Sequence, residues 1–175
     1  MEEIIEQLQI SFDIQSGIRR GYIKTELWGS TTGGSPWSLH LDKNQKLRKI
    51  TINHEDWIYS IGFTIENLKG LLDSSRREGG TGPLAGRNVS EVNFDIDEEI
   101  IGIDVTVVVT TGYYPNHEVI SSVCLMTNKK KHGPFGKETD TRFSARWDVG
   151  SFEGFFGRAA FYLDGLGCYL TDTVT

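Results

Sequence analysis

The sequence predicts an all-β domain, and two observations carry this prediction. Apolar and polar residues alternate with period two over several stretches, which is the pattern of a strand with one buried and one solvated face. The 20 glycines among the 175 residues punctuate these stretches, with glycine-rich turns at 33–34, 79–80 and 112. Many short strands joined by such turns are typical of a sandwich, a barrel or a prism. The strand pattern alone leaves these three architectures open.

The first two dozen residues have a pattern of their own. Residues 3–8 are compatible with one turn of helix, whereas residues 9–14 alternate like a strand. We therefore divide the chain into an N-terminal extension of unknown role, residues 1–23, and one domain over residues 24–175. The sequence leaves open whether the extension pairs with the domain, mediates oligomerisation, is disordered or is the remnant of a partner domain.

The strongest strand signals lie in the middle and the last third of the chain. Over residues 56–66, the apolar positions of one predicted face are Trp57, Tyr59, Ile61, Phe63 and Ile65. Residues 142–149 alternate in the same way and, like residues 56–66, predict an antiparallel strand with one wet face. Residues 100–111 and 119–127 are rich in Val, Ile and Thr, which predicts strands buried on nearly both faces.

Composition excludes several classes of function. The 18 basic and 24 acidic side chains give a net charge of −6, which argues against binding to nucleic acid or to anionic membranes. No apolar stretch reaches the length of a membrane span. The N-terminus lacks the pattern of a signal peptide, and Cys124 and Cys168 lie in apolar runs as small buried side chains. We therefore expect a cytoplasmic or nucleocytoplasmic protein.

No residue pattern predicts an enzyme, a metal site or a cofactor. The histidines at positions 40, 54, 117 and 132 have neither metal-ligand spacing nor an adjacent nucleophile motif. We expect His132 to lie on the surface of a turn. The acidic run over residues 95–99 lacks the glycine and ligand spacing of a calcium loop, so we expect a solvated turn there. Lys129, Lys130 and Lys131 form the one basic run, also predicted as a solvated turn.

Four segments together resemble the jacalin-related lectins of the mannose-binding type. Their order and spacing, rather than any single motif, carry the resemblance, which covers about residues 24–171. The segments are Trp28-Gly29 with Gly33-Gly34-Ser35-Pro36-Trp37, then His132-Gly133-Pro134-Phe135-Gly136, Phe155-Phe156-Gly157-Arg158, and Tyr162-Leu163-Asp164-Gly165-Leu166-Gly167. The resemblance implies a β-prism of three four-stranded antiparallel Greek-key sheets and a sugar site in loops at one end.

The resemblance also implies which residues bind the sugar. Family members join the last glycine of an opening loop to a Gly-x-x-x-Asp turn near the C-terminus. Here the opening glycine corresponds to Gly34, with Gly33 beside it, and the acidic residue to Asp164. The backbone amides correspond to Phe161 and Tyr162, one of which we expect to pack inward while the other offers a ring to the sugar. Tyr113 and Tyr114 fall in a loop beside this site, where a plain hairpin turn is an equally good interpretation.

One residue departs from the family pattern. Ala160 stands where the Gly-x-x-x-Asp turn begins with glycine, and the opening loop carries the additional Ser30-Thr31-Thr32. A β-carbon costs little in an extended backbone and about 1 kcal/mol or more at positive φ.

The resemblance as a whole implies a metal-free lectin for mannose- or glucose-type glycans that acts as a homodimer. The family is mainly from plants and is linked to defence. The alternative is a protein-interaction module whose sugar site has degenerated.

Overall fold

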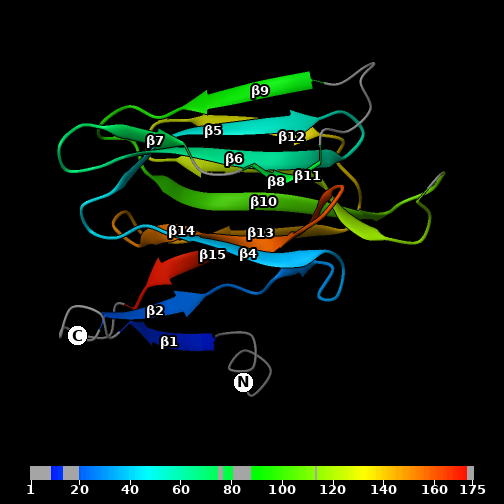
Figure 1. The fold of residues 1–175 in the computed structure, drawn as a ribbon, viewed down its shortest axis with the longest axis horizontal. Helices are drawn as coiled ribbons and strands as arrows, with labels where there is room; N and C mark the ends of the chain where they lie inside the picture. The colour runs from blue at the N-terminus through cyan, green and yellow to red at the C-terminus, as the bar shows by residue number, and fades with distance from the viewer. Residues whose placement is uncertain (1–8, 14–19, 75–76, 81–87, 113, 173–175) are drawn as a thin grey trace.

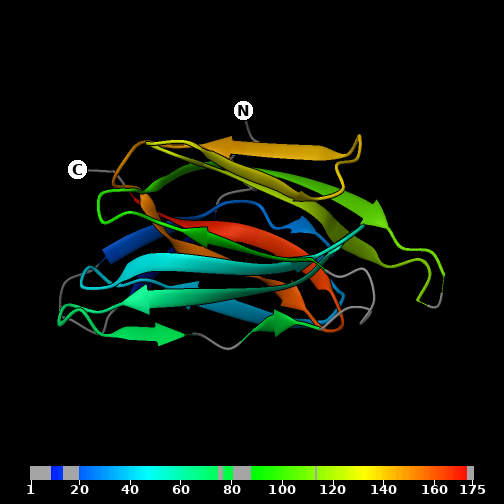
Figure 2. The same cartoon turned by 90° about the horizontal axis from the view of Figure 1, so that it is seen from above.

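The computed structural model describes residues 9–13, 20–74, 77–80, 88–112 and 114–172. These residues form strands, turns and loops and contain no helix, so none of them builds a helix that could cross a bilayer. The strands make three antiparallel sheets whose strands run along the long axis of the molecule (Figures 1 and 2). The all-β prediction is confirmed.

The first sheet brings together the two ends of the chain. Its strands are β1 (Gln9–Asp13), β2 (Arg20–Lys24), β3 (Trp28–Gly29), β4 (Ser35–His40), β14 (Phe152–Ala159) and β15 (Leu163–Thr171). The order is β1-β2-β15-β14-β4, and β3 pairs with the same strand β15 beyond the end of β2. The β14–β15 hairpin is therefore flanked by strands from the N-terminal part of the chain.

The other two sheets are each built from consecutive strands. The second contains β5 (Lys46–His54), β6 (Ile58–Glu66), β7 (Leu72–Ser74), β8 (Glu78–Gly79) and β9 (Asn88–Asn93). The third contains β10 (Ile100–Val109), β11 (Glu118–Thr127), β12 (Lys131–Gly136) and β13 (Arg142–Arg146). Their orders, β7-β6-β5-β9 and β12-β11-β10-β13, place the last strand beside the first, which is the Greek-key arrangement.

The number of strands in each sheet differs from the uniform four that the resemblance implied. The sheets have six, five and four strands. In the first sheet, β2 and β3 occupy one strand position in two pieces, and β1 adds a strand at the edge (Figure 1). In the second sheet, the short β8 pairs with β6 beside β7. The boundary predicted at Lys24 falls on the last residue of β2, and the helical turn predicted over residues 3–8 lies outside the described residues.

All three sheets contribute to one apolar core. Phe155 of β14, Ile61 of β6 and Ile103 of β10 belong to a single cluster and are almost completely buried. The ring of Phe155 stacks on that of Phe63 with centroids 5.2 Å apart, which joins the first sheet to the second. Strands β10 and β11, which the sequence predicted to be buried on nearly both faces, are buried along nearly their whole length. This shared core holds the three sheets together and thereby positions the loops at the two ends of the prism.

The face of β6 that was predicted to be wet is partly buried. Ser60 is fully buried, and its hydroxyl accepts a hydrogen bond of 2.6 Å from the amide nitrogen of Asn53 on the neighbouring strand β5. A polar side chain satisfied in this way is compatible with a buried position. The two cysteines, Cys124 and Cys168, are buried and unpaired with each other, as predicted.

The surface position predicted for His132 is wrong. The side chain of His132 is only 10% exposed and its Nε2 lies 2.7 Å from Oε2 of Glu98. The hydroxyl of Thr127 donates to the same carboxylate oxygen at 2.7 Å, and the backbone N–H of Asp95 donates to the other oxygen at 3.1 Å. Glu98 itself is buried, although it belongs to the acidic run that was predicted to be solvated. His132 lies in β12 rather than in a turn.

These hydrogen bonds determine the charge state of Glu98. Burial alone would raise the pKa of the Glu98 carboxyl, but the hydrogen bonds from Thr127, His132 and the Asp95 backbone outweigh it and lower the pKa below its ordinary value of 4.5. The folded protein therefore favours the ionised form. This contribution to stability is present above pH 4.5 or so and is lost as the pH falls through the lowered pKa.

We predict that Glu98→Gln destabilises the protein at pH 7 by roughly 1–3 kcal/mol, because one acceptor oxygen becomes a donor that faces Thr127 and His132. Urea denaturation at pH 7 and at pH 3.5 measures the effect. The difference between variant and wild type should shrink at the lower pH. Glu91→Gln, at an exposed position of β9, is the matched control and should change little. Equal stability of Glu98→Gln and wild type at pH 7 would contradict this account.

Candidate functional site

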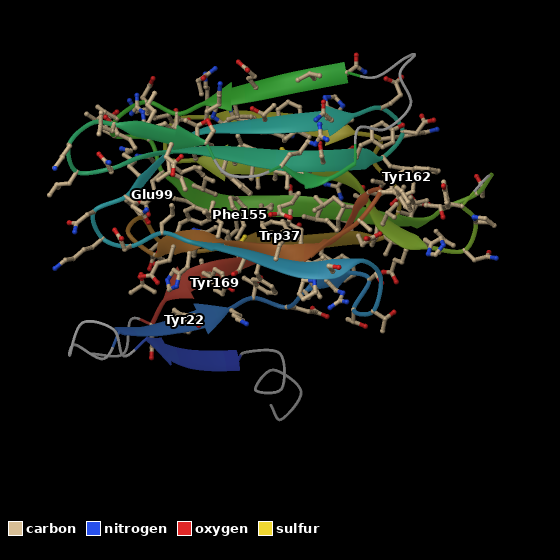
Figure 3. All side chains as sticks on the ribbon, in the orientation of Figure 1. Tyr22, Trp37, Glu99, Phe155, Tyr162 and Tyr169 are labelled. Atoms are coloured by element: carbon tan, nitrogen blue, oxygen red, sulfur yellow. The ribbon has the colours of Figure 1, made fainter. Side chains whose placement is uncertain are left out.

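Three loops meet at one end of the prism. The opening loop, residues 30–34, joins β3 to β4, and the turn of residues 160–162 joins β14 to β15. The third loop, of which the structure describes residues 110–112 and 114–117, joins β10 to β11. Tyr162 marks this end of the molecule in Figure 3. The strand pairing therefore brings residues 130 positions apart into one place.

Gly34 and Asp164 are in direct contact at the centre of this end. A β-carbon on Gly34 would lie 2.5 Å from Oδ2 of Asp164 and 2.7 Å from the backbone of Ala159. The backbone of Gly34 also has a φ of 64°, in the left-handed region that glycine adopts without strain. Any larger residue would therefore displace the carboxylate or the end of β14.

The opening loop is held from inside by Ser30. Its hydroxyl accepts hydrogen bonds from the backbone N–H groups of Gly33 at 2.7 Å and Thr32 at 3.3 Å. The backbone N–H of Ser30 donates to the carbonyl oxygen of Asp164 at 2.9 Å. The additional Ser-Thr-Thr stretch is thus an ordered turn that packs on the Asp164 backbone.

Arg158 holds the same loop from outside. Its guanidinium donates to the carbonyl oxygens of Gly33 at 2.8 Å, Gly34 at 2.9 Å and Thr32 at 3.5 Å. A planar group with several donors in a fixed arrangement suits three neighbouring carbonyls better than the single ammonium of a lysine. Arg158 belongs to β14 and so ties the opening loop to the strand that leads into the 160–162 turn.

The carboxylate of Asp164 is buried and incompletely satisfied. The residue is 6% exposed, and Oδ2 has no hydrogen-bond partner within the described part of the chain. Burial raises the pKa of this carboxyl to about 6, against the opposing attraction of His117 and Arg158. A buried acceptor without a partner is costly to the fold and is the kind of group that a ligand satisfies.

Free donors lie beside this free acceptor. Hydrogen bonds between described residues use the N–H of Ala160, which donates to the carbonyl of Tyr162 at 3.1 Å, but not those of Phe161 and Tyr162. The carbonyl of Phe161 accepts a hydrogen bond of 3.1 Å from the N–H of Gly80, which attaches the turn to the residue that follows β8. A carboxylate oxygen and backbone N–H groups held at one place can bind a pair of hydroxyl groups, each as donor or acceptor.

Aromatic rings surround this polar centre. Tyr162 packs inward, with ring centroids 5.3 Å from Trp57 and 6.0 Å from Tyr59. Phe161 is 63% exposed and stacks on Tyr114 with centroids 5.2 Å apart and the planes inclined by 24°. One ring thus packs inward and the other is exposed, while the expected contact of the exposed ring with a sugar stays a prediction. The stacked pair forms an exposed apolar wall beside the carboxylate.

The structure brings together seven of the eight residues that were predicted for the site. They are Gly33, Gly34, Tyr114, Ala160, Phe161, Tyr162 and Asp164. Tyr113 lies outside the described residues. Ala160 is exposed and its φ is negative, since Asn116 is the one described non-glycine residue with positive φ. The backbone at Ala160 therefore does not require glycine.

Sequence reasoning assigned no role to Arg158, Ser30 or His117. Arg158 was visible as a single basic residue at the end of an apolar strand, two residues before the turn. Its bonds to the opening loop depend on the pairing of β14 with β4, which the sequence does not reveal. Among the described residues, no group of three or more His, Cys, Asp or Glu side chains is arranged to hold a metal ion.

Comparison with known proteins identifies the family. The model of the jacalin-like lectin domain matches residues 25–169. The chain belongs to the jacalin-like lectin family. This match includes the opening loop, the 160–162 turn and Asp164, and leaves the whole N-terminal extension, residues 1–23, outside.

Individual relatives agree with this assignment. The jacalin-related lectin Calsepa of Calystegia sepium is 33% identical over 147 residues, which are 81% of this chain and 90% of the relative. A mannose/glucose-specific lectin of Parkia pendula is 33% identical over 87% of this chain, but the match spans only 32% of that longer protein. A solved structure of a mannose-specific jacalin-related lectin from Morus nigra, in complex with mannose, superimposes with a TM-score of 0.74. It is 28% identical and covers 85% of this chain and 94% of its own. The β-prism fold is thereby confirmed.

We predict that Arg158→Gln loosens the opening loop without unfolding the domain. The loop loses hydrogen bonds from a charged donor, each worth roughly 1.5–3 kcal/mol when buried and less where water competes. Hydrogen exchange measured by mass spectrometry should rise over residues 30–34, while the core strand β10 stays protected. Arg142→Gln, on the exposed edge of β13, is the matched control. Unchanged exchange in the opening loop of Arg158→Gln would show that these bonds do not order it.

Proposed function

We propose that the protein binds mannose- or glucose-type glycans at the Asp164 end of the prism. The single observation that carries this proposal is the buried, unpartnered Oδ2 of Asp164 beside the free N–H groups of the 160–162 turn. Two vicinal sugar hydroxyls would donate to the carboxylate, and the backbone N–H groups would donate to the sugar oxygens. Relatives that are described as mannose/glucose-specific, or that hold mannose, support this choice of ligand.

The exposed stack of Tyr114 and Phe161 would take the apolar face of the sugar or of a second sugar unit. This pair stands at the rim of the site rather than in the core, with exposed fractions of 47% and 63%. A shallow site with a few hydrogen bonds in competition with water gives weak binding of a monosaccharide. Useful avidity would come from multivalent glycans and from the pairing of two copies of the chain. The expected homodimer stays a prediction, which analytical ultracentrifugation can test by measuring the mass of the protein in solution.

We predict that Asp164→Asn loses binding and gains stability. The ionised carboxylate has a raised pKa of about 6 in the folded protein, so it opposes folding at pH 7, and the neutral amide removes this cost of roughly 1–3 kcal/mol. Calorimetric titration with methyl α-mannoside should show at least a tenfold loss of affinity, since a charged acceptor is removed. The melting temperature should rise by a few degrees.

The pH dependence of the wild type provides a second measurement of the same group. Affinity for methyl α-mannoside should be constant above pH 7 and should fall as the pH is lowered through about 6. The reason is that a protonated carboxyl accepts hydrogen bonds from fewer hydroxyl groups than a carboxylate does. Asp140→Asn, in an exposed loop, is the matched control and should bind like wild type. If Asp164→Asn unfolds the chain at pH 7, the carboxylate is structural and the proposal fails. Binding by Asp164→Asn at wild-type affinity would contradict it equally.

For Ala160→Gly we predict no gain in affinity. The backbone at Ala160 has negative φ, so alanine imposes no strain that glycine would relieve. The added freedom of the unfolded chain should lower stability by about 0.4–1 kcal/mol. Titration of both proteins with the same mannoside and thermal unfolding check this result. A several-fold increase in affinity would show instead that alanine partly disables the site.

A further inference from the structure

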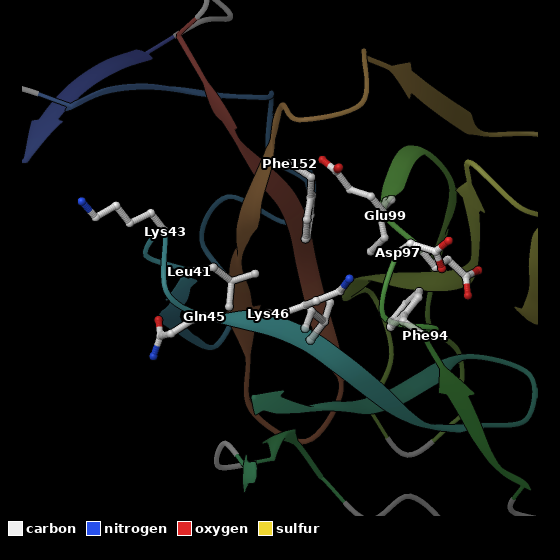
Figure 4. A pocket seen from close by; sticks show the side chains of 11 residues that line it. Leu41, Lys43, Gln45, Lys46, Phe94, Asp97, Glu99 and Phe152 are labelled. Atoms are coloured by element: carbon white, nitrogen blue, oxygen red, sulfur yellow. The ribbon is translucent and has the colours of Figure 1, made fainter. Parts of the chain in front are cut away.

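A cavity lies at the end of the prism opposite to Asp164. Its volume is about 370 Å³, within the range of small-molecule sites. Its walls come from the segment that joins β4 to β5 with the first two residues of β5, and from the segment that joins β9 to β10 with the first residue of β10. The first residue of β14 completes them (Figure 4). Glu99 of this cavity and Tyr162 of the Asp164 site mark opposite ends of the molecule in Figure 3.

The floor of this cavity is apolar and rigid. It is formed by Leu41, Phe94 and Phe152, and the ring of Phe152 projects into the cavity in Figure 4. This ring stacks on Trp147 with centroids 6.2 Å apart and planes inclined by 13°, and meets Phe155 edge-on at 5.0 Å. Its orientation is therefore fixed by the core. An aromatic ring fixed in this way offers a preorganised apolar surface to a ligand.

Donors with spare capacity line one side. Lys43 and Lys46 form no ion pair within the described part of the chain. The side-chain oxygen of Gln45 accepts from the N–H of Asp42 at 3.1 Å, which orients the amide and leaves its nitrogen free. The Lys46 ammonium projects across the cavity toward the acidic wall in Figure 4.

Acceptors line the other side on a segment that is held in place. The buried Glu98 fixes the segment through Thr127 and His132, as described above. Glu99 accepts a hydrogen bond of 2.7 Å from the N–H of Gly150 with one oxygen, while its backbone N–H donates to Asn128 at 2.8 Å. The second oxygen of Glu99 has no partner among the described residues. This wall is thus ordered before any ligand arrives.

The balance of charges selects the class of ligand. The carboxylate of Glu99 disfavours an anion, whereas that of Asp97 is already in an ion pair with Lys129. The ammonium groups of Lys43 and Lys46 disfavour a cation. A neutral polyhydroxylated ring has donors for the carboxylates, acceptors for the lysines and the amide, and an apolar face for Phe152. We propose that this cavity is a second saccharide site, which takes one neutral hexopyranoside unit and makes a single chain bivalent.

The test uses the Asp164→Asn chain, in which the proposed first site is silent. Two-dimensional ¹H–¹⁵N NMR during titration with methyl α-mannoside should show saturable shifts at the amides of Gln45, Lys46, Asp97 and Glu99, with a dissociation constant in the millimolar range. Glycerol at equal concentration should not reproduce them. Lys46→Met in the same background should weaken binding about fivefold, whereas Lys69→Met, at an exposed turn, should leave it unchanged.

Three results would overturn this proposal. The first is the absence of saturable shifts in these amides, and the second is an equal response to glycerol. The third is saturation by benzoate but not by the mannoside, which would assign the cavity to an amphipathic anion. In the wild-type chain, the amide shifts of residues 161–164 report on the first site separately. The absence of binding at one site can therefore be told apart from the absence of binding at the other.

Discussion

The site depends on one unfavourable burial, that of the Asp164 carboxylate at the end of the β14–β15 hairpin. A free carboxylate would be solvated, but here the neighbouring Leu163 and Leu166 are completely buried and Oδ2 has no partner among the described residues. The core that surrounds the hairpin supplies the free energy that keeps this charge in place. The raised pKa of about 6 is the direct sign of that cost. Hydroxyl groups of a ligand can recover it.

The surrounding residues are explained by this constraint. Gly34 is needed because a β-carbon would occupy the space of the carboxylate oxygen. Ser30 and Arg158 hold the opening loop so that Gly34 stays in place. The N–H groups of Phe161 and Tyr162 stay free because the turn is held through the carbonyls of these two residues, which accept from the N–H groups of Gly80 and Ala160. The loop, the guanidinium and the turn thus form one preorganised unit.

The sequence was informative where a pattern is local. Period-two alternation predicted β6 and β13, and the runs of β-branched residues predicted the buried strands β10 and β11. Local patterns did not predict contacts between distant segments, and the contact of Gly34 with Asp164 was expected only from the family resemblance. His132 was expected on the surface, because its partner Glu98 lies 34 positions earlier in an acidic run that resembles a solvated turn. Arg158 gained no role, because its acceptors lie on a loop more than 120 positions away.

Titration of the Asp164 carboxyl shows directly whether its burial opposes ionisation. The pKa of its carboxyl can be followed by ¹³C NMR in the free protein and with saturating methyl α-mannoside. We expect a pKa of about 6 in the free protein and a clear decrease when the ligand's hydroxyl groups bind the ionised form. A pKa near the ordinary 3.8 in the free protein, unchanged by the mannoside, would contradict this expectation.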